Sequence, residues 1–121
     1  MTEHEPLPTE RQSITKKILL GELEGYVTVG FYEDGRAGEM FLTMHRVGTF
    51  EHGLLHALAL SVSVGLQHGV PLEKYVEKFR GMAFEPAGAY KDGDETRFAA
   101  SVLDWLARWL EKRVLKRGVK E

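Results

Sequence analysis

The sequence predicts an α+β domain in which a three-stranded antiparallel meander, built from two hairpins, precedes three helices packed on one face of the sheet. Three observations support this β-β-β-α-α-α order. Apolar residues alternate with a period of two between Ser13 and Met44, and an Asp34-Gly35 pair interrupts that stretch. After Gly48 the apolar residues recur with the period of a helix.

An extended arm is expected before the first strand, because residues 1–12 contain two prolines and no periodic apolar pattern. The strand begins at Ser13 and should end in a reversal between Gly21 and Gly25. One side of it should carry Ile14, Lys16, Ile18 and Leu20. We expect residues 13–117 to form a single domain and residues 118–121 a short tail, since 121 residues are close to the usual size of one domain.

The Asp-Gly pair is the strongest short signal for a hairpin, and it places Glu33 opposite Arg36. The register that follows puts two pairs on one face, namely Val29 with Met40 and Val27 with Leu42. The other face is less polar than a solvated sheet surface usually is, and it carries Tyr26, Thr28, Phe41 and Thr43. We therefore expect this face to be covered by the arm, by a second subunit or by a ligand.

The first helix follows Thr49, which can serve as its N-cap, and it is apolar on nearly every side. We expect it to be central, between the sheet and other helices or against a second copy of the chain. Gly69 ends this helix and Pro71 begins a short amphipathic second helix. Residues 81–95 are expected to form a loop and residues 96–116 a third helix. The inner stripe of the third helix should contain Phe98, Val102, Trp105 or Leu106, Trp109 and Arg113.

Composition excludes several functional classes. The chain has no cysteine, which rules out disulfides, thiolate metal sites and thiol redox chemistry. It has no uninterrupted apolar run of about 18 residues, and its net charge of −2 provides no general attraction to nucleic acid. Its acidic, polar beginning differs from a secretory signal, so we expect a soluble, cytoplasmic protein. Since no nucleophile–base pair or phosphate-binding glycine loop is apparent, no catalytic residues and no cofactor are predicted.

Two groups of side chains are candidates for chemistry or binding. His52 and His56 have the i, i+4 spacing that places two imidazoles on one helix face, but two ligands do not complete a metal site. The loop Phe84-Glu85-Pro86-Ala87-Gly88 follows an irregular path fixed by proline and glycine. Its aromatic ring and carboxylate either anchor and cap the loop or face a partner. The basic residues between 108 and 120 are favoured as a solvated helix face, and the two tryptophans as core residues.

Two strings, Glu24–Met44 and Leu66–Gly88, together resemble the TSCPD-type C-terminal domain of adenosylcobalamin-dependent (class II) ribonucleotide reductases. The resemblance extends over nearly the whole chain, from the region of Leu7 to that of Leu110. Ala87 stands where the family usually has serine. The positions that match are Gly25, Tyr26, Val29, Gly35, Gly38 and Glu39 in the hairpin, Gly69, Pro71, Leu72 and Glu73 at the helix junction, the Phe84-Glu85-Pro86-x-Gly88 loop, and Ser101, Asp104 and Trp109.

This resemblance implies a non-catalytic accessory or regulatory module of nucleotide metabolism. It would act by contact with a reductase catalytic chain, with another macromolecule or with itself. At 121 residues without cysteine, the chain lacks room for the catalytic barrel and the thiols of radical nucleotide reduction. The alternative is a small-molecule binding protein, for example for a nucleotide. Candidate binding residues for both interpretations are Arg36, Glu39, Phe84, Glu85, Pro86 and Gly88.

A homodimer is also expected, because one three-stranded sheet leaves the apolar first helix, Trp105 and Trp109 with much surface to cover. Neither a membrane nor a nucleic acid is expected as a partner.

Overall fold

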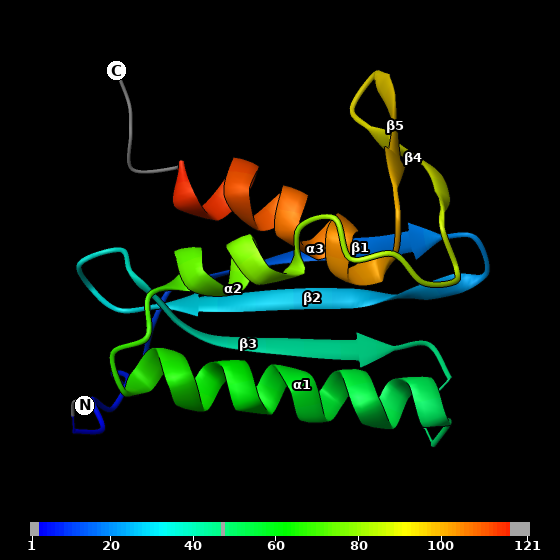
Figure 1. Cartoon of the computed structure of the whole chain (residues 1–121). Helices are drawn as coiled ribbons and strands as arrows, with labels where there is room; N and C mark the ends of the chain where they lie inside the picture. Colours follow the sequence, from blue (N-terminus) through cyan, green and yellow to red (C-terminus); the bar gives the residue numbers. More distant parts are fainter. Residues whose placement is uncertain (1–2, 47, 117–121) are drawn as a thin grey trace. The chain divides into compact units, whose positions relative to one another are not determined.

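The computed structural model describes residues 3–46 and 48–116 of the chain. Its elements are β1 (Ser13–Leu20), β2 (Leu23–Phe31), β3 (Ala37–Met44), α1 (Phe50–Gln67), α2 (Leu72–Phe79), β4 (Gly88–Asp92), β5 (Glu95–Ala99), α3 (Val102–Leu110) and a π-helical turn, Glu111–Leu115 (Figure 1). The predicted α+β class is confirmed, with a three-stranded antiparallel sheet in the order β1-β2-β3 and three helices. None of the described helices is long and apolar enough to cross a membrane.

The chain separates into two compact units. The first contains Met1–Ile18 and Glu24–Pro71, and the second contains Leu19–Leu23 and Leu72–Glu121. Most of the three-stranded sheet and α1 belong to the first unit, whereas α2, the β4–β5 hairpin and α3 belong to the second. The tail predicted at residues 118–121 lies outside the described residues.

The predicted register of β2 and β3 is confirmed, and the four aligned side chains are all buried. They are Val27 with Leu42 and Val29 with Met40. The turn differs from the prediction, because the Tyr32 N–H donates to the Arg36 carbonyl (2.9 Å) and the loop therefore has three residues, the last of them Gly35 with φ +95°. A bulge between Gly30 and Phe31 offsets the additional loop residue and restores the predicted alignment in the rest of the pair.

The other face of the sheet is exposed within this chain. Tyr26 is 49% exposed and Phe41 is 40% exposed. The arm does not cover them, so that alternative is wrong, whereas coverage by a second subunit or by a ligand stays a prediction. The arm lies instead between the hairpin and the end of α1, where the Glu5 N–H donates to the Gln67 carbonyl (2.8 Å) and the Tyr32 hydroxyl donates to the Glu5 carbonyl (2.6 Å).

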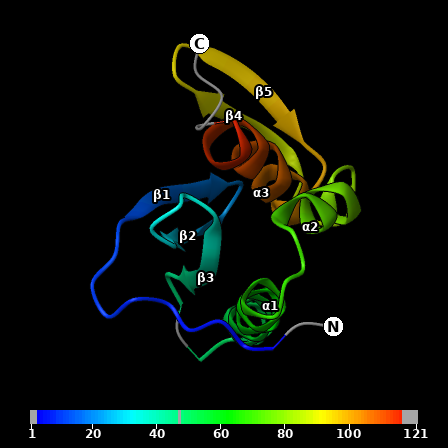
Figure 2. The ribbon, with the colours of Figure 1, turned by 90° about the vertical axis from the view of Figure 1, so that its left-hand side faces the viewer.

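Helix α1 begins at the predicted N-cap, since the Thr49 hydroxyl accepts a hydrogen bond from the His52 N–H (3.2 Å). It runs along the free edge of β3 (Figures 1 and 2). The hydroxyl of Ser63 accepts from the Met40 N–H (2.8 Å) and donates to the Met40 carbonyl (3.0 Å). The Gln67 amide donates to the Gly38 carbonyl (2.9 Å) in the same way. The helix thus gives the edge strand the polar partners that a further strand would supply.

Only part of the surface of α1 is buried within the chain. Ala59, Val62 and Leu66 are buried. In contrast, Phe50 is 77% exposed and Val64 is 60% exposed. The expectation of a helix covered on all sides by the sheet and other helices is therefore wrong for the single chain, and only the alternative of a second copy remains.

The loop predicted for residues 81–95 is found only as far as residue 87, and a hairpin of two strands follows it. β4 and β5 pair antiparallel, from Gly88 opposite Ala99 to Asp92 opposite Glu95. The third helix consequently begins after its N-cap Ser101 and not at residue 96. Phe98 lies in β5 and is 62% exposed, so its assignment to an inner helix stripe is wrong.

Helix α3 otherwise buries the predicted residues. Val102, Trp105 and Leu106 are buried and Trp109 is half-buried, whereas Arg113, also assigned to the inner stripe, is exposed. The rings of Trp105 and Trp109 stack with their centroids 6.2 Å apart, and Tyr90 meets Trp105 edge-on. The two tryptophans therefore help to form the core of the second unit.

Candidate functional site

The six candidate binding residues fall into two groups, one in each unit. Arg36 and Glu39 belong to the β2–β3 hairpin of the first unit. The others form the loop before β4 in the second unit, and they are Phe84, Glu85, Pro86 and Gly88.

Arg36 ties the arm to the hairpin. Its guanidinium pairs with the carboxylates of Glu5 (2.9 Å) and Asp34 (2.8 Å) and lies 4.5 Å from the centroid of the Tyr32 ring. The hydrogen bonds with Glu5 and Asp34 raise the pKa of Arg36 above its ordinary value. Arg36 is thus occupied by partners within the chain.

Glu39 is also occupied. The guanidinium of Arg11 donates two hydrogen bonds to the carboxylate of Glu39, with lengths of 2.7 and 3.0 Å. Glu39 is only 9% exposed, and its carboxylate folds over Gly30, where an added Cβ would lie 2.2 Å from a carboxylate oxygen. The glycine therefore provides the space for this ion pair.

The loop group is more open. Phe84 is 45% exposed, Glu85 is exposed, and the Glu85-Pro86 peptide bond is cis. The backbone of the loop is nevertheless held, because the Phe84 N–H donates to the Ala100 carbonyl (3.0 Å) just beyond β5. The loop therefore has a fixed backbone that leaves an aromatic ring and a carboxylate accessible to solvent.

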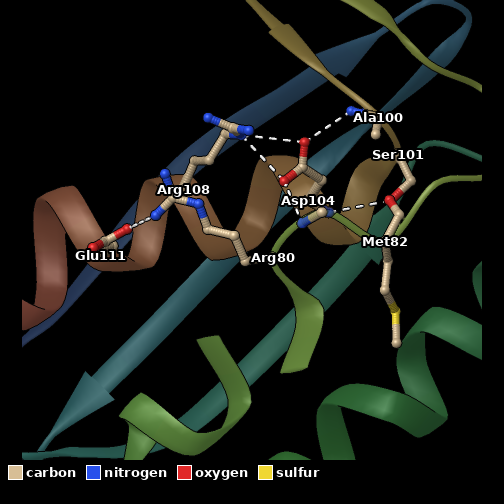
Figure 3. A network of polar contacts seen from close by, with 8 residues as sticks. Arg80, Met82, Ala100, Ser101, Asp104, Arg108 and Glu111 are labelled. Carbon is tan, nitrogen blue, oxygen red and sulfur yellow. Dashed lines mark hydrogen bonds and ion pairs between the residues drawn. The ribbon is translucent and has the colours of Figure 1, made fainter. Parts of the chain in front are cut away.

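A buried polar network holds this loop to the start of α3 (Figure 3). Asp104 is 1% exposed, and its carboxylate accepts hydrogen bonds from the N–H groups of Gly81 (2.8 Å) and Ala100 (2.8 Å). The hydroxyl of Ser101 accepts from the Asp104 N–H (3.1 Å) and donates to the Met82 carbonyl (2.6 Å). The network therefore joins residues 81–82, 100–101 and 104 into one support for the loop.

Charged side chains extend the network along α3. The Nε of Arg108 lies 3.1 Å from both carboxylate oxygens of Asp104, and Arg80 pairs with Glu111 one turn further on. Burial favours the neutral form of Asp104, but the hydrogen bonds from Ala100, Gly81 and Arg108 outweigh it and hold the pKa of Asp104 below its ordinary value. The carboxylate is therefore ionised at neutral pH and fully paired.

This arrangement predicts a loss of stability in acid. The pKa of Asp104 is lower in the folded chain than in the unfolded chain, and so is that of Asp92, which is held down by Lys112 and Arg97. A carboxyl group whose pKa is lower in the folded chain stabilises the fold at pH values above its unfolded pKa of about 3.9. This contribution is lost as the pH falls through the folded pKa. We expect the free energy of unfolding, measured by urea denaturation, to decrease from about pH 5 downward. A constant value from pH 5 to pH 2 would contradict this prediction.

Three exposed apolar side chains surround the supported loop. Met82 is 41%, Phe84 45% and Phe98 62% exposed. They come from adjacent segments, because hydrogen bonds from Ser101 to Met82 and from Phe84 to Ala100 place residues 82–84 beside the end of β5. We call Met82, Phe84 and Phe98 the loop patch. All three apolar side chains face solvent, on segments whose backbones are joined by these hydrogen bonds.

The side chains of His52 and His56 take part in contacts within the chain. The Nδ1 atom of His52 accepts a hydrogen bond from the Met44 N–H (3.2 Å) at the edge of β3, and its ring stacks on His56 with centroids 6.0 Å apart. Within residues 3–46 and 48–116, no group of three or more potential ligands is placed to hold a metal ion.

Of the C-terminal basic residues, Arg108 and Lys112 pair with Asp104 and Asp92, whereas residues 117–121 lie outside the described part.

Sequence reasoning missed Arg11 and Ser63 and did not identify the partners of Asp104. Arg11 is 28 residues from Glu39, and Ser63 is 23 residues from Met40. For Ser101 and Asp104 a local signal existed, because a serine three residues before an acidic residue is typical of a helix N-terminus.

Comparisons with a family model and with individual proteins point to the same domain. The family model described as the TSCPD domain matches residues 2–114. The chain is 39% identical over 117 residues to a vitamin B12-dependent ribonucleotide reductase of Bradyrhizobium diazoefficiens, covering 97% of this chain and 9% of that protein. A reductase of the same name from Rhodopirellula baltica is 45% identical, and the alignment covers 88% of this chain and 10% of that protein. Another from Streptantibioticus cattleyicolor is 47% identical, and the alignment covers 86% of this chain and 17% of that protein. No solved structure gives a significant match.

Proposed function

Because the chain belongs to the TSCPD domain family, we propose that it is a non-catalytic binding module that contacts the catalytic part of a vitamin B12-dependent ribonucleotide reductase. The observation that carries this proposal is the extent of the similarity. Nearly all of this chain, 97%, aligns with only 9% of a relative named as such a reductase. The chain thus corresponds to one small part of a much larger enzyme, and contact with the remainder is the role that this relation supports best.

The loop patch is the surface that we assign to this contact. Its aromatic and methionine side chains are of the types enriched in protein interfaces. The network around Asp104 fixes the backbone beneath it, which reduces the entropy lost on binding. Glu85 is exposed in the same loop and can supply part of a polar rim. Contact through such a surface requires neither a nucleophile nor a bound cofactor.

Substitution of Phe84 by serine should weaken binding to the reductase at least tenfold, because a buried interface aromatic contributes more than 1.4 kcal/mol in many complexes. The measurement is biolayer interferometry with a purified catalytic chain of a B12-dependent reductase from the same organism. The matched control is Phe41→Ser, which changes a phenylalanine of similar exposure, 40% against 45%, on the sheet of the other unit. If the two variants bind with equal affinity, the loop patch is not part of the interface. If the unchanged chain does not bind the reductase, the proposal itself is contradicted.

A small-molecule binding role is the alternative, and it predicts a different result. In that case nucleotides or cobalamins added to the isolated chain should raise its melting temperature in proportion to the logarithm of their concentration. Under the proposal made above, the same additions leave the melting temperature unchanged, while the reductase chain raises it.

A further inference from the structure

The stripe of α1 that is centred on Ala57 carries no charged residue. Seven residues lie within about 60° of Ala57 around the helix axis, taking about 100° per residue. All seven are exposed, and they are Phe50, Gly53, Leu54, Ala57, Leu60, Ser61 and Val64. We call these seven residues the outer face of α1. A helix face that remains in water usually carries charged or polar residues, so this composition indicates a face that is covered in use.

The residues of the outer face are arranged symmetrically about Ala57. Leucines lie three positions away on both sides, small residues lie four positions away, and large apolar residues lie seven positions away. An antiparallel second helix related by a two-fold axis at Ala57 would therefore meet a matching residue at every level. The resulting pairs are Ala57 with Ala57, Leu54 with Leu60, Gly53 with Ser61, and Phe50 with Val64.

From this symmetry we propose that the chain forms a homodimer in which two α1 helices pack antiparallel through their outer faces, with the two-fold axis at Ala57. A two-fold interface requires a surface that complements itself, and an unrelated partner imposes no such symmetry on the sequence. Gly53, Ala57 and Ser61 recur every four residues and allow the two backbones to approach closely. The antiparallel helix dipoles oppose each other favourably, and no charge is buried.

The size of the outer face indicates a reversible dimer. Its large side chains are substantially exposed, from 47% for Leu60 to 77% for Phe50. They present an apolar area on the order of 400 Å² per copy, compared with about 800 Å² per partner in a standard interface. A dissociation constant in the micromolar range is therefore expected, and the dimer should be visible across a concentration series.

Sedimentation velocity on the full chain from about 1 to 200 μM should show a concentration-dependent dimer. Leu54→Glu should raise its dissociation constant at least tenfold, because the symmetry places the buried charge in the interface twice. Leu19→Glu is the matched control, since Leu19 is 55% exposed and Leu54 is 54% exposed, and it should leave the dissociation constant unchanged. Circular dichroism checks that both variants remain folded.

A cysteine substitution tests the register independently of Leu54. The chain has no cysteine of its own, so Ala57→Cys introduces a single thiol. At a two-fold axis the two Cα atoms come close enough for a disulfide, and mild oxidation should give a covalent dimer far faster than it does for Thr43→Cys, at an exposed site on the sheet. The proposal is overturned if the chain is a strict monomer at 200 μM or if the two cysteine variants cross-link equally. It is also overturned if no dimer forms and Leu54→Glu instead weakens binding to the reductase.

Discussion

Replacement of Asp104 by asparagine should lower the free energy of unfolding by about 3 kcal/mol. The carboxylate accepts the N–H groups of Gly81 and Ala100 and faces Arg108 while only 1% exposed. An asparagine has one acceptor oxygen, and its amide nitrogen would point a donor at another donor. At least one buried N–H would therefore lose its partner, and Arg108 would lose its counter-charge.

The matched control for this prediction is Asp94→Asn, which makes the same chemical change at an exposed position between β4 and β5. Urea denaturation should place this variant within about 0.5 kcal/mol of the unchanged chain. Hydrogen exchange provides a local check, because the amides of Gly81 and Ala100 should exchange faster in Asp104→Asn. If the two variants are equally stable, the network around Asp104 is not a significant support of the loop.

The same substitution should also flatten the response to acid. Asparagine does not titrate, so the part of the acid destabilisation that arises from the lowered pKa of Asp104 disappears, while the part from Asp92 remains.

The β2–β3 register could be predicted because local signals determined it. The Asp-Gly turn and the alternation of apolar residues both favour the pairing of Val29 with Met40. The predicted loop was one residue too short, but the bulge beside Gly30 corrects the resulting offset in register. Without this correction, a slip of one residue would turn the apolar side chains to the solvent. Burial of one face therefore determines the register more strongly than the turn does.

The β4–β5 hairpin could not be recognised in the same way. Nearly all of β5 is exposed, so its sequence lacks the alternation that a half-buried strand shows. Phe98 lies four residues before Val102, and this spacing imitates the stripe of a helix although the ring faces solvent. The signal for a turn was present in Asp92-Gly93, where the glycine has a φ of +66°.

The site residues were predicted in part, and the physical reason is distance along the chain. The loop from Phe84 to Gly88 is a local string and could be singled out. Its support by Asp104 joins residues up to 23 positions apart, and no sequence period encodes such a contact. Arg36 and Glu39 were identified by type, but their partners in the arm became visible only in the folded chain.

Substitution of Ser63 by alanine should have the second large effect on stability, about 2 kcal/mol. The hydroxyl of Ser63 satisfies both the N–H and the carbonyl of Met40 at the edge of β3, and both residues are buried. Alanine fits the same space but provides no hydrogen bond. Two backbone groups would lose their partners where water has little access, and the cost of an unpaired buried polar group is about 1–3 kcal/mol.

Ser61 provides the matched control on the same helix, two residues away. The sequence does not distinguish the two serines, since both lie in the alternating string from Leu58 to Gly65. In the structure Ser61 is exposed and Ser63 is 8% exposed, because two residues correspond to about 200° around the helix. Ser61→Ala should therefore change the unfolding free energy by less than about 0.5 kcal/mol, measured by urea denaturation at a concentration where the chain is monomeric. An equal effect of the two substitutions would mean that the helix does not complete the hydrogen bonding of the β3 edge.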